Sequence, residues 1–459
     1  MRYVSTRGCA PELGFADVLL GGLAGDGGLY VPATWPQLPA AHGAGSYAER
    51  AAQVMLPFVE PDFGEPTLRR LCDEAYASFR HPAVVPLVQL DHRSWMLELF
   101  HGPTLAFKDV ALQLVGRMFD HVLGARGQRV TIIGATSGDT GSAAIEAVAG
   151  CEHVDIVILY PAGRPSEVQR RQMTTVAAEN AHAVAVEGTF DDCQDLVKAM
   201  FNDTGFRERN RLSAVNSINW ARVMAQVVYY VTVAETFRSP VTFSVPTGNF
   251  GNVLAGWIAR RMGASIERFV IASNRNDILT RFVNDDDMSM RDVIPTMSPS
   301  MDIQVSSNFE RLLFEMNGRD GGMTAEQLGR FRARGRLDVE ADQRREYIEG
   351  TFMAAAVDDD ETLAEIGRVH AQSGWLIDPH TATGTAAARR LADRLGAGPV
   401  VTLGTAHPAK FPDAVVRATG VRPVLPDHLA DLLDRTERFE TVNNELASVE
   451  ALVERLTRR

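Results

Sequence analysis

The sequence predicts an α/β protein built on parallel sheets, with an extra N-terminal unit before them. From about residue 96, short apolar runs typical of buried strands alternate with helical patterns, and this alternation favours parallel sheets covered by helices. Two glycine-rich turns each join a strand to a helix. The 459 residues, 45% of them apolar, suffice for a large core and for two or three domains.

Residues 1–95 are expected to form the N-terminal domain. Turn signals such as Gly21-Gly22 and Gly27-Gly28 interrupt this stretch, and helical patterns run near 47–55 and 67–79. At the other end of the chain, residues 426–459 predict a charged, amphipathic helical tail.

The region between these ends carries the alternating pattern. We expect strands at 95–100, 129–133, 154–160, 183–186, 241–245, 269–272 and 400–403. We expect helices over 106–123, 142–149, 220–237 and 253–262. Ligands of parallel α/β folds bind beyond the carboxyl ends of the strands, which is where both glycine-rich turns fall.

Charge and cysteine usage exclude several classes of protein. The net charge of −12 argues against general affinity for nucleic acid or an anionic membrane, although one small anionic substrate remains compatible with it. Apolar runs are far shorter than the roughly 20 residues that span a bilayer, and residues 1–10 carry no export signal. The cysteines have neither zinc-site nor disulfide-framework spacing. We expect a cytoplasmic protein without a metal site.

Lysine is rare in this chain. Lys and Arg total 46, yet only Lys108, Lys198 and Lys410 are lysines, a bias typical of a GC-rich genome. Arginine is always protonated and cannot form a Schiff base, so each lysine is a candidate for covalent chemistry. Lys198 follows Asp195 by three residues and is interpreted as a surface residue.

Lys108 is the strongest of the three candidates. It opens a predicted helix, where the helix dipole disfavours a cation and therefore favours the neutral, nucleophilic amine. The alternative is an ordinary lysine paired with Asp109. Lys410 follows His407, and its role stays open, as do the roles of His407 and His380.

Several turns have the composition of anion-binding sites. The turn at 246–252 combines glycine and asparagine with a helix start, which suits a phosphate cradle without a P-loop lysine, or alternatively a plain turn. The turn at 135–142 offers four hydroxyls, of which helix capping explains only one. Asn216, Ser217 and Arg222 open a long helix and either grip an anion or merely cap it. Thr405 offers a neutral hydroxyl after a strand.

Seven segments together resemble a known family. HGPTLAFKD (101–109), SGDTGSAA (137–144), NSINWAR (216–222), PTGNFGN (246–252), SPSMDIQVSSNFERLLF (298–314), DPHTA (378–382) and TAHPAKF (405–411) are similar to the threonine synthases of many bacteria and fungi. The resemblance covers about residues 4–415. It implies a fold-type II pyridoxal-phosphate enzyme, related to the tryptophan synthase β subunit. It further implies a catalytic module over 96–425 with two parallel-sheet α/β lobes, the smaller about 128–224.

The resemblance also implies an activity and a set of site residues. Such enzymes convert O-phospho-L-homoserine and water to L-threonine and phosphate. Lys108 would hold pyridoxal 5'-phosphate, Thr405 would face its pyridine nitrogen, and the cofactor phosphate would bind at Gly248, Asn249, Phe250, Gly251 and Asn252. The substrate would meet Ser137, Asp139, Thr140, Asn216, Ser217 and Arg222. Many fold-type II enzymes carry Asn where Asp139 stands, so the role of this charge is open.

Two alternatives remain at this stage. One is another pyridoxal enzyme of the same fold, such as a serine or threonine dehydratase or a phospholyase. The other is a non-catalytic, threonine-synthase-like binding protein, which the intact Lys108 and both glycine-rich turns disfavour. We expect a monomer or a homodimer that binds a small-molecule substrate and no nucleic acid.

Overall fold

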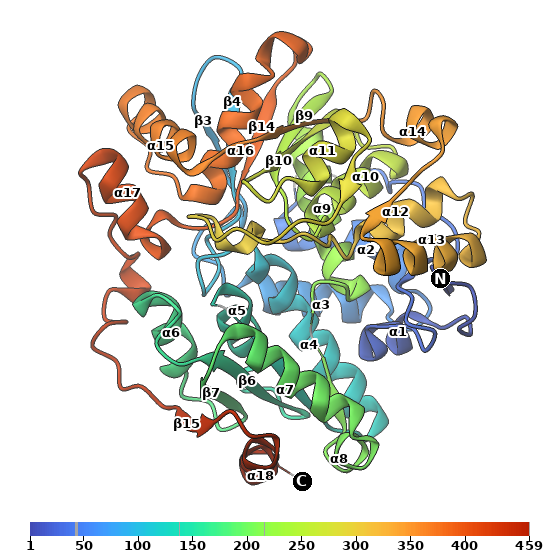
Figure 1. The fold of residues 1–459 in the computed structure, drawn as a ribbon, viewed down its shortest axis with the longest axis vertical. Helices are drawn as coiled ribbons and strands as arrows, with labels where there is room; N and C mark the ends of the chain where they lie inside the picture. Colours follow the sequence, from blue (N-terminus) through green and yellow to red (C-terminus); the bar gives the residue numbers. More distant parts are fainter. Residues whose placement is uncertain (42–44, 137, 215, 459) are drawn as a thin grey trace.

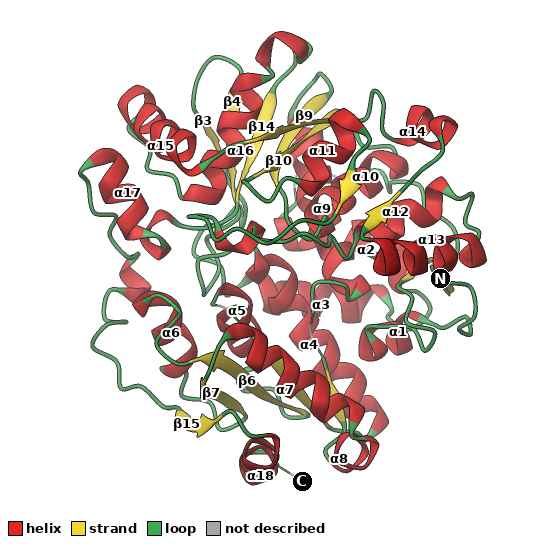
Figure 2. Ribbon diagram, viewed as in Figure 1, coloured by secondary structure: helices red, strands yellow, loops and turns green. Residues whose placement is uncertain are grey.

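The structure, a computed structural model, describes residues 1–41, 45–136, 138–214 and 216–458. Two parallel or mostly parallel sheets organise it, one in the upper and one in the lower half of Figure 1. Helices surround both sheets and fill the space between them (Figure 2). The α/β class with parallel sheets is therefore confirmed.

The upper sheet has six strands in the order β13-β10-β9-β14-β4-β3. These strands are β3 (Leu87–Gln89), β4 (Ser94–Glu98), β9 (Val241–Pro246), β10 (Ile266–Ser273), β13 (Phe352–Ala356) and β14 (Val400–Gly404). Only the β3–β4 pair is antiparallel. Every residue of β9 and β14 is buried, as expected for central strands covered on both faces.

The lower sheet has five parallel strands in the order β15-β7-β6-β5-β8. They are β5 (Val130–Ala135), β6 (Val154–Pro161), β7 (Ala181–Glu187), β8 (Leu212–Ser213) and β15 (Glu440–Asn443). The prediction of a helical tail over 426–459 is correct for α18 (Leu446–Leu456) and wrong for residues 440–443, because these form β15, which pairs with the open edge of β7. Only α18 is a long helix there, and its Val449 and Val453 pack in the small-sheet core.

The helices carry most of the core. They are α1 (Phe15–Gly21), α2 (Tyr47–Val59), α3 (Glu65–Tyr76), α4 (Lys108–Arg126), α5 (Asp139–Val148), α6 (Glu167–Thr174), α7 (Phe190–Asn202), α8 (Thr204–Arg209), α9 (Trp220–Thr236), α10 (Gly251–Met262), α11 (Ile278–Asp285), α12 (Phe309–Met316), α13 (Gly321–Arg334), α14 (Ala341–Tyr347), α15 (Asp359–Ser373), α16 (Pro379–Arg390) and α17 (Pro412–Thr419). Helices α4 and α9 are buried over most of their length and contact each other.

The N-terminal segment packs onto the same core. Strands β1 (Tyr3–Ser5) and β2 (Tyr30–Pro32) form an antiparallel ribbon, while α2 contacts α9 and α3 contacts α4. Tyr3 donates to the Phe58 carbonyl and accepts from the Trp220 indole, which ties the chain start to α9. The domain boundaries near residues 95, 128, 224 and 425 stay predictions.

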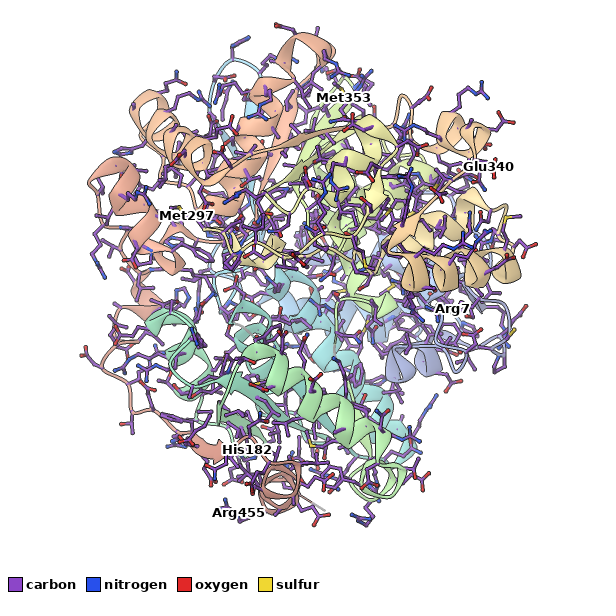
Figure 3. All side chains as sticks on the ribbon, viewed as in Figure 1. Arg7, His182, Met297, Glu340, Met353 and Arg455 are labelled. Carbon is purple, nitrogen blue, oxygen red and sulfur yellow. The ribbon has the colours of Figure 1, made fainter. Side chains whose placement is uncertain are left out.

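Two long segments run across the molecule with little regular secondary structure. Residues 290–308, which contain the short helix η1 (Pro299–Met301), cross its middle, where Met297 is labelled in Figure 3. After α17 the chain runs down one side past α6 to β15 (Figure 1). The remaining strands, β11 (Met288–Ser289) and β12 (Arg336–Leu337), pair with each other. No helix among the described residues is long and apolar enough to cross a membrane.

Candidate active site

Lys108 is the first residue of α4, and the turn before it is built to place it. In that turn Leu105 adopts a positive φ of 61°. Asp109 closes it by accepting hydrogen bonds from the N–H and the hydroxyl of Thr104, at 2.8 and 2.6 Å. The alternative that Lys108 pairs with Asp109 is wrong, because Lys108 forms its ion pair with Asp139, while Asp109 accepts from Thr104.

Lys108 instead faces Asp139, the first residue of α5. The side chain of Lys108 is buried, and its Nζ lies 3.7 Å from Oδ2 of Asp139. Burial lowers the pKa of Lys108, Asp139 raises it, and the charges of Lys410 and Arg222 lower it further, for a net lowering. Lys108 is thus poised towards the neutral amine that covalent chemistry requires.

Asp139 also contacts a second lysine. Lys410 Nζ lies 3.0 Å from Oδ1 of Asp139, and the Gln169 amide donates to the same oxygen at 2.9 Å. Burial alone would raise the pKa of this carboxyl, but Lys410, Lys108 and Gln169 hold it well below its usual range. Asp139 is therefore an ionised carboxylate between two lysines.

The glycine-rich turn before α5 is organised by a hydroxyl that was not singled out as a site residue. Thr136 accepts the N–H groups of Gly138 and Gly141, at 3.0 and 2.9 Å. Gly138 has a φ of 155°, and a side chain there would strike Gln169. The N-cap position of α5 is Gly138 itself, so neither Asp139 nor Thr140 caps the helix. Ser137 lies outside the described residues.

The turn at 246–252 forms an open cradle at the end of β9. Phe250 adopts a left-handed φ of 63°, and α10 begins directly after it, two residues earlier than predicted. The first-turn N–H groups of a helix have no intrahelical acceptor and suit an anion. A Cβ on Gly248 would lie 2.9 Å from the Ser300 carbonyl oxygen, so this position has no room for a side chain.

Hydrogen bonds from 299–308 hold the cradle in shape. The Ser306 hydroxyl donates to the Gly248 carbonyl at 2.6 Å, and the Asn308 N–H donates to the Asn249 carbonyl at 3.1 Å. Asn252, buried, accepts the hydroxyls of Tyr229 and Tyr230 at its Oδ1, while its Nδ2 has no partner. An unpaired buried amide at the cradle is a donor that fits a phosphate oxygen.

Arg222 is the second unpaired donor of the site. It lies in the first turn of α9 and is 5% exposed, yet its Nε and Nη1 have no hydrogen-bond partner. Burial lowers the pKa of its guanidinium to about 10. Asn216 is exposed and accepts the Ile218 N–H, and the Ser217 carbonyl accepts from Asn308 at 3.1 Å. Arg222 is thus the one of these three predicted anion ligands with buried, unused donors.

Thr405 follows β14 and lies beside the start of α4. Its carbonyl accepts the Phe107 N–H at 2.9 Å, and Ala406 forms a bridge with Ala106. Thr405 is buried, at 6% exposure. The structure therefore brings the predicted cofactor-facing threonine next to Lys108, although the two lie 297 positions apart in the sequence.

The histidines that the sequence left open support the site from outside. His380 accepts the Ser300 N–H at Nε2, so its proton is on Nδ1, which donates to the Asp378 carboxylate; this steadies the residues packed on Gly248. His407 accepts the Ala409 N–H at 3.2 Å and so caps η3 (Pro408–Lys410), which carries Lys410. Gln169 and Thr136 were missed, because single polar residues in a helix or turn carry no sequence signal of their own.

The residues fit pyridoxal phosphate. Lys108 is a buried amine with a lowered pKa, which suits an aldehyde. The turn at Gly248 has no room for a side chain, and the unpaired donors of Asn252 and Arg222 suit anions. No cluster of metal-ligating side chains occurs among the described residues. Fold and site place the chain in the class of pyridoxal-phosphate-dependent enzymes, and the family model "Pyridoxal-phosphate dependent enzyme" matches residues 81–329.

Comparison with known proteins narrows this class. The models "Threonine synthase N terminus" and "Threonine synthase, C-terminal" match residues 2–76 and 381–453. A threonine synthase of Pseudomonas aeruginosa is 54% identical over 468 residues, covering 99% of this chain and 98% of its own. The chain belongs to the threonine synthase family, and its cofactor is pyridoxal phosphate.

Solved structures agree with this assignment. A threonine synthase of Brucella melitensis with bound pyridoxal phosphate superposes with a TM-score of 0.97 at 52% identity, covering 100% of both chains. The yeast threonine synthase superposes with a TM-score of 0.94 at 38% identity, covering 99% of this chain and 98% of its own. The fold-type II architecture is therefore confirmed.

Proposed function

We propose that the chain converts O-phospho-L-homoserine and water to L-threonine and phosphate. The observation that carries this proposal is the environment of Arg222. Its buried guanidinium has two unpaired donors and lies near enough to Lys108 for its charge to lower the pKa of that lysine. An unpaired buried cation is costly, and a doubly charged phosphate group beside it would relieve that cost. A phosphorylated amino acid supplies both this phosphate and an amine for the Lys108 end of the site.

In this proposal Lys108 holds pyridoxal phosphate, and residues Gly248, Asn249, Phe250, Gly251 and Asn252 bind the cofactor phosphate. Thr405 presents a neutral hydroxyl to the pyridine nitrogen. When bound, pyridoxal phosphate supplies an electron sink for a carbanion at the substrate Cα.

The side chains of this chain transfer protons, stabilise the leaving phosphate and bind the substrate. Lys108, buried and with a lowered pKa, moves protons at Cα and then at Cβ. Phosphate leaves from Cγ, where Arg222 stabilises the charge that develops on it, together with Asn216 and Ser217. Protonation at Cγ, addition of water at Cβ and return of a proton to Cα, for which Lys108 is in place, complete threonine. Ser137, Asp139 and Thr140 hold the substrate carboxylate and the cofactor ring.

The direct test is threonine formation from O-phospho-L-homoserine, measured with released phosphate, in the presence and absence of added pyridoxal phosphate. We expect equal amounts of threonine and phosphate, dependent on the cofactor. Phosphate accompanied by ammonia instead of threonine would identify an elimination enzyme and overturn the proposal. Threonine as substrate is the control, and it should release no ammonia.

The cellular setting follows from the same features. We propose a cytoplasmic enzyme, monomeric or homodimeric, that takes a small-molecule substrate and binds no nucleic acid. The net charge of −12 and four unpaired cysteines, two of them buried, support this setting. Light scattering during size-exclusion chromatography distinguishes one subunit from two.

A further inference from the structure

Lys410 is a fully buried lysine that the proposed function does not use. Its side chain is 0% exposed, and three oxygen atoms surround Nζ. Nζ donates to the Thr104 carbonyl at 2.7 Å and to Gln172 Oε1 at 2.8 Å, and it lies 3.0 Å from Oδ1 of Asp139. Fully buried lysines are rare unless paired, so this arrangement calls for a role.

These contacts define the charge of Lys410. A neutral amine has two N–H groups and one lone pair, so among three oxygens its lone pair would point at one of them. An ammonium donates in all three directions and gains a carboxylate partner. Lys410 is therefore an ammonium held within a fixed set of acceptors.

Lys108 lies farther from the Asp139 carboxylate than Lys410 does. Its Nζ lies 3.7 Å from Oδ2 of Asp139, beyond hydrogen-bond distance, whereas Oδ1 is engaged by both Lys410 and Gln169. Two lysines thus share one negative charge, and geometry favours Lys410.

We propose that Lys410 is a positioning residue: it serves as the permanent counter-ion of Asp139, so that Lys108 remains the free amine of the site. This inference rests on the proposed role of Lys108 as the cofactor-binding lysine. It also explains how a site with Asp at position 139 works without tying up that lysine in an ion pair. Removing either partner of the Asp139–Lys410 pair would unbalance the charge that Lys108 experiences.

The other charged groups near Lys108 leave this balance in place. Arg222 adds a positive charge that does not depend on Lys410. Asp109, which is held by Thr104, raises the pKa of Lys108 less than Asp139 does. His380 lies near enough to Asp139 to lower the pKa of that carboxyl. The Asp139–Lys410 pair has no net charge. Substitution of Lys410 leaves a negative charge beside Lys108, and substitution of Asp139 leaves a positive one.

The small number of lysines makes a direct test feasible. In the cofactor-free full chain labelled with 13C at lysine Cε, only three side-chain signals are expected, assigned by substitution. Lys410→Met should raise the pKa of Lys108 by about 1 to 2 pH units, because Asp139 then has Lys108 as its only nearby lysine. Asp139→Asn should lower it below the wild-type value. The double variant, which restores a neutral pair, should return close to wild type.

The surface lysine provides the matched control. Lys198→Met removes an exposed ion pair with Asp195 and should leave the Lys108 titration unchanged. An unchanged Lys108 pKa in Lys410→Met, or a double variant that titrates like Lys410→Met alone, would overturn the proposal. If Lys410→Met does not fold, the double variant must titrate above Asp139→Asn, and equality overturns the proposal. Threonine formation is measured separately, so failure of the proposed function would be distinguishable.

Discussion

Asp109 accepts both the backbone N–H and the hydroxyl of Thr104, at 2.8 and 2.6 Å. This relationship spans the turn that leads into α4 and fixes where Lys108 begins the helix. The Thr104 carbonyl is held in turn by Lys410 and Gln172. One threonine therefore links the turn, the buried carboxylate of Asp109 and the second buried lysine.

Asp109→Asn should destabilise the fold. The amide replaces one acceptor oxygen with a donor, so a Thr104 donor loses its partner in the core, at a cost of about 1 to 3 kcal/mol. Urea unfolding measures this loss as a lowered midpoint with an unchanged slope. Asp195→Asn, which alters an exposed pair, is the control and should stay within about 0.5 kcal/mol of wild type. Equal stability of the two variants would refute the role given to Asp109.

Arg222→Met should weaken phosphate binding without lowering the stability of the fold. The variant should bind inorganic phosphate roughly 10- to 100-fold more weakly, because charged hydrogen bonds contribute about 1.5 to 3 kcal/mol. Its free energy of unfolding should be equal or higher, because an unpaired buried guanidinium is removed. Calorimetric titration of phosphate and urea unfolding measure the two effects. Arg455→Met, at an exposed position of α18 (Figure 3), should change neither. Weakened stability with unchanged phosphate binding would contradict the anion-site assignment.

Gly248→Ala should weaken cofactor binding. Its Cβ would lie 2.9 Å from the Ser300 carbonyl oxygen and 3.1 Å from Ile303, so the cradle must widen. Overpacking of this kind costs about 1 to 3 kcal/mol, equivalent to roughly a 5- to 150-fold loss in pyridoxal phosphate affinity. Gly329→Ala, in helix α13 with open space around it, is the matched control. Equal cofactor affinity of the two variants, measured by fluorescence titration, would argue against the cradle.

His407 should make stability depend on pH. Burial lowers the pKa of His407 to about 4, so the folded chain binds fewer protons than the unfolded chain below the ordinary value of 6.5. Stability is therefore complete above about pH 6.5 and falls as the pH drops towards 4, by roughly 2 kcal/mol for a partly exposed group.

His407→Asn isolates this contribution. Asparagine does not titrate but keeps an acceptor for the Ala409 N–H, so the variant should lose less stability than wild type between pH 7 and about pH 4.5. Burial raises the pKa of Asp109 to about 6, and that carboxyl acts with the opposite sign. Because Asp109 is present in both proteins, its contribution cancels when the stability of the variant is subtracted from that of wild type at each pH. Parallel loss of stability in the two proteins would exclude His407 as the titrating group.

The sequence predicted the framework of the fold well and its edges poorly. Apolar runs such as 154–160 and 241–245 became central strands, because burial on both faces leaves a clear pattern. Strand β15 was missed, since its exposed, alternating residues become a strand only by pairing with β7. Helices α5 and α10 begin earlier than expected, after Gly138 and Phe250 at positive φ.

The candidate site followed the same division. The places of Lys108, the 248–252 turn and Thr405 in the fold could be predicted, because their motifs combine a reactive residue or glycines with a helix start or a strand end. Their roles toward the cofactor stay predictions. The charge network could not, since Lys410 reaches Asp139 across 271 positions of the sequence. Hydrogen-bond partners such as Gln169 depend on how α6 packs, and no local pattern encodes that packing.

The most direct test of the account is the site of cofactor attachment. Borohydride reduction of the cofactor-loaded chain fixes pyridoxal phosphate to the lysine that holds it, and peptide mass spectrometry then locates the modification. With only three lysines in the chain, the result is unambiguous. The account predicts modification at Lys108 alone, and its loss, together with threonine formation, in Lys108→Ala. Modification at Lys410 or Lys198 in the active enzyme would contradict it.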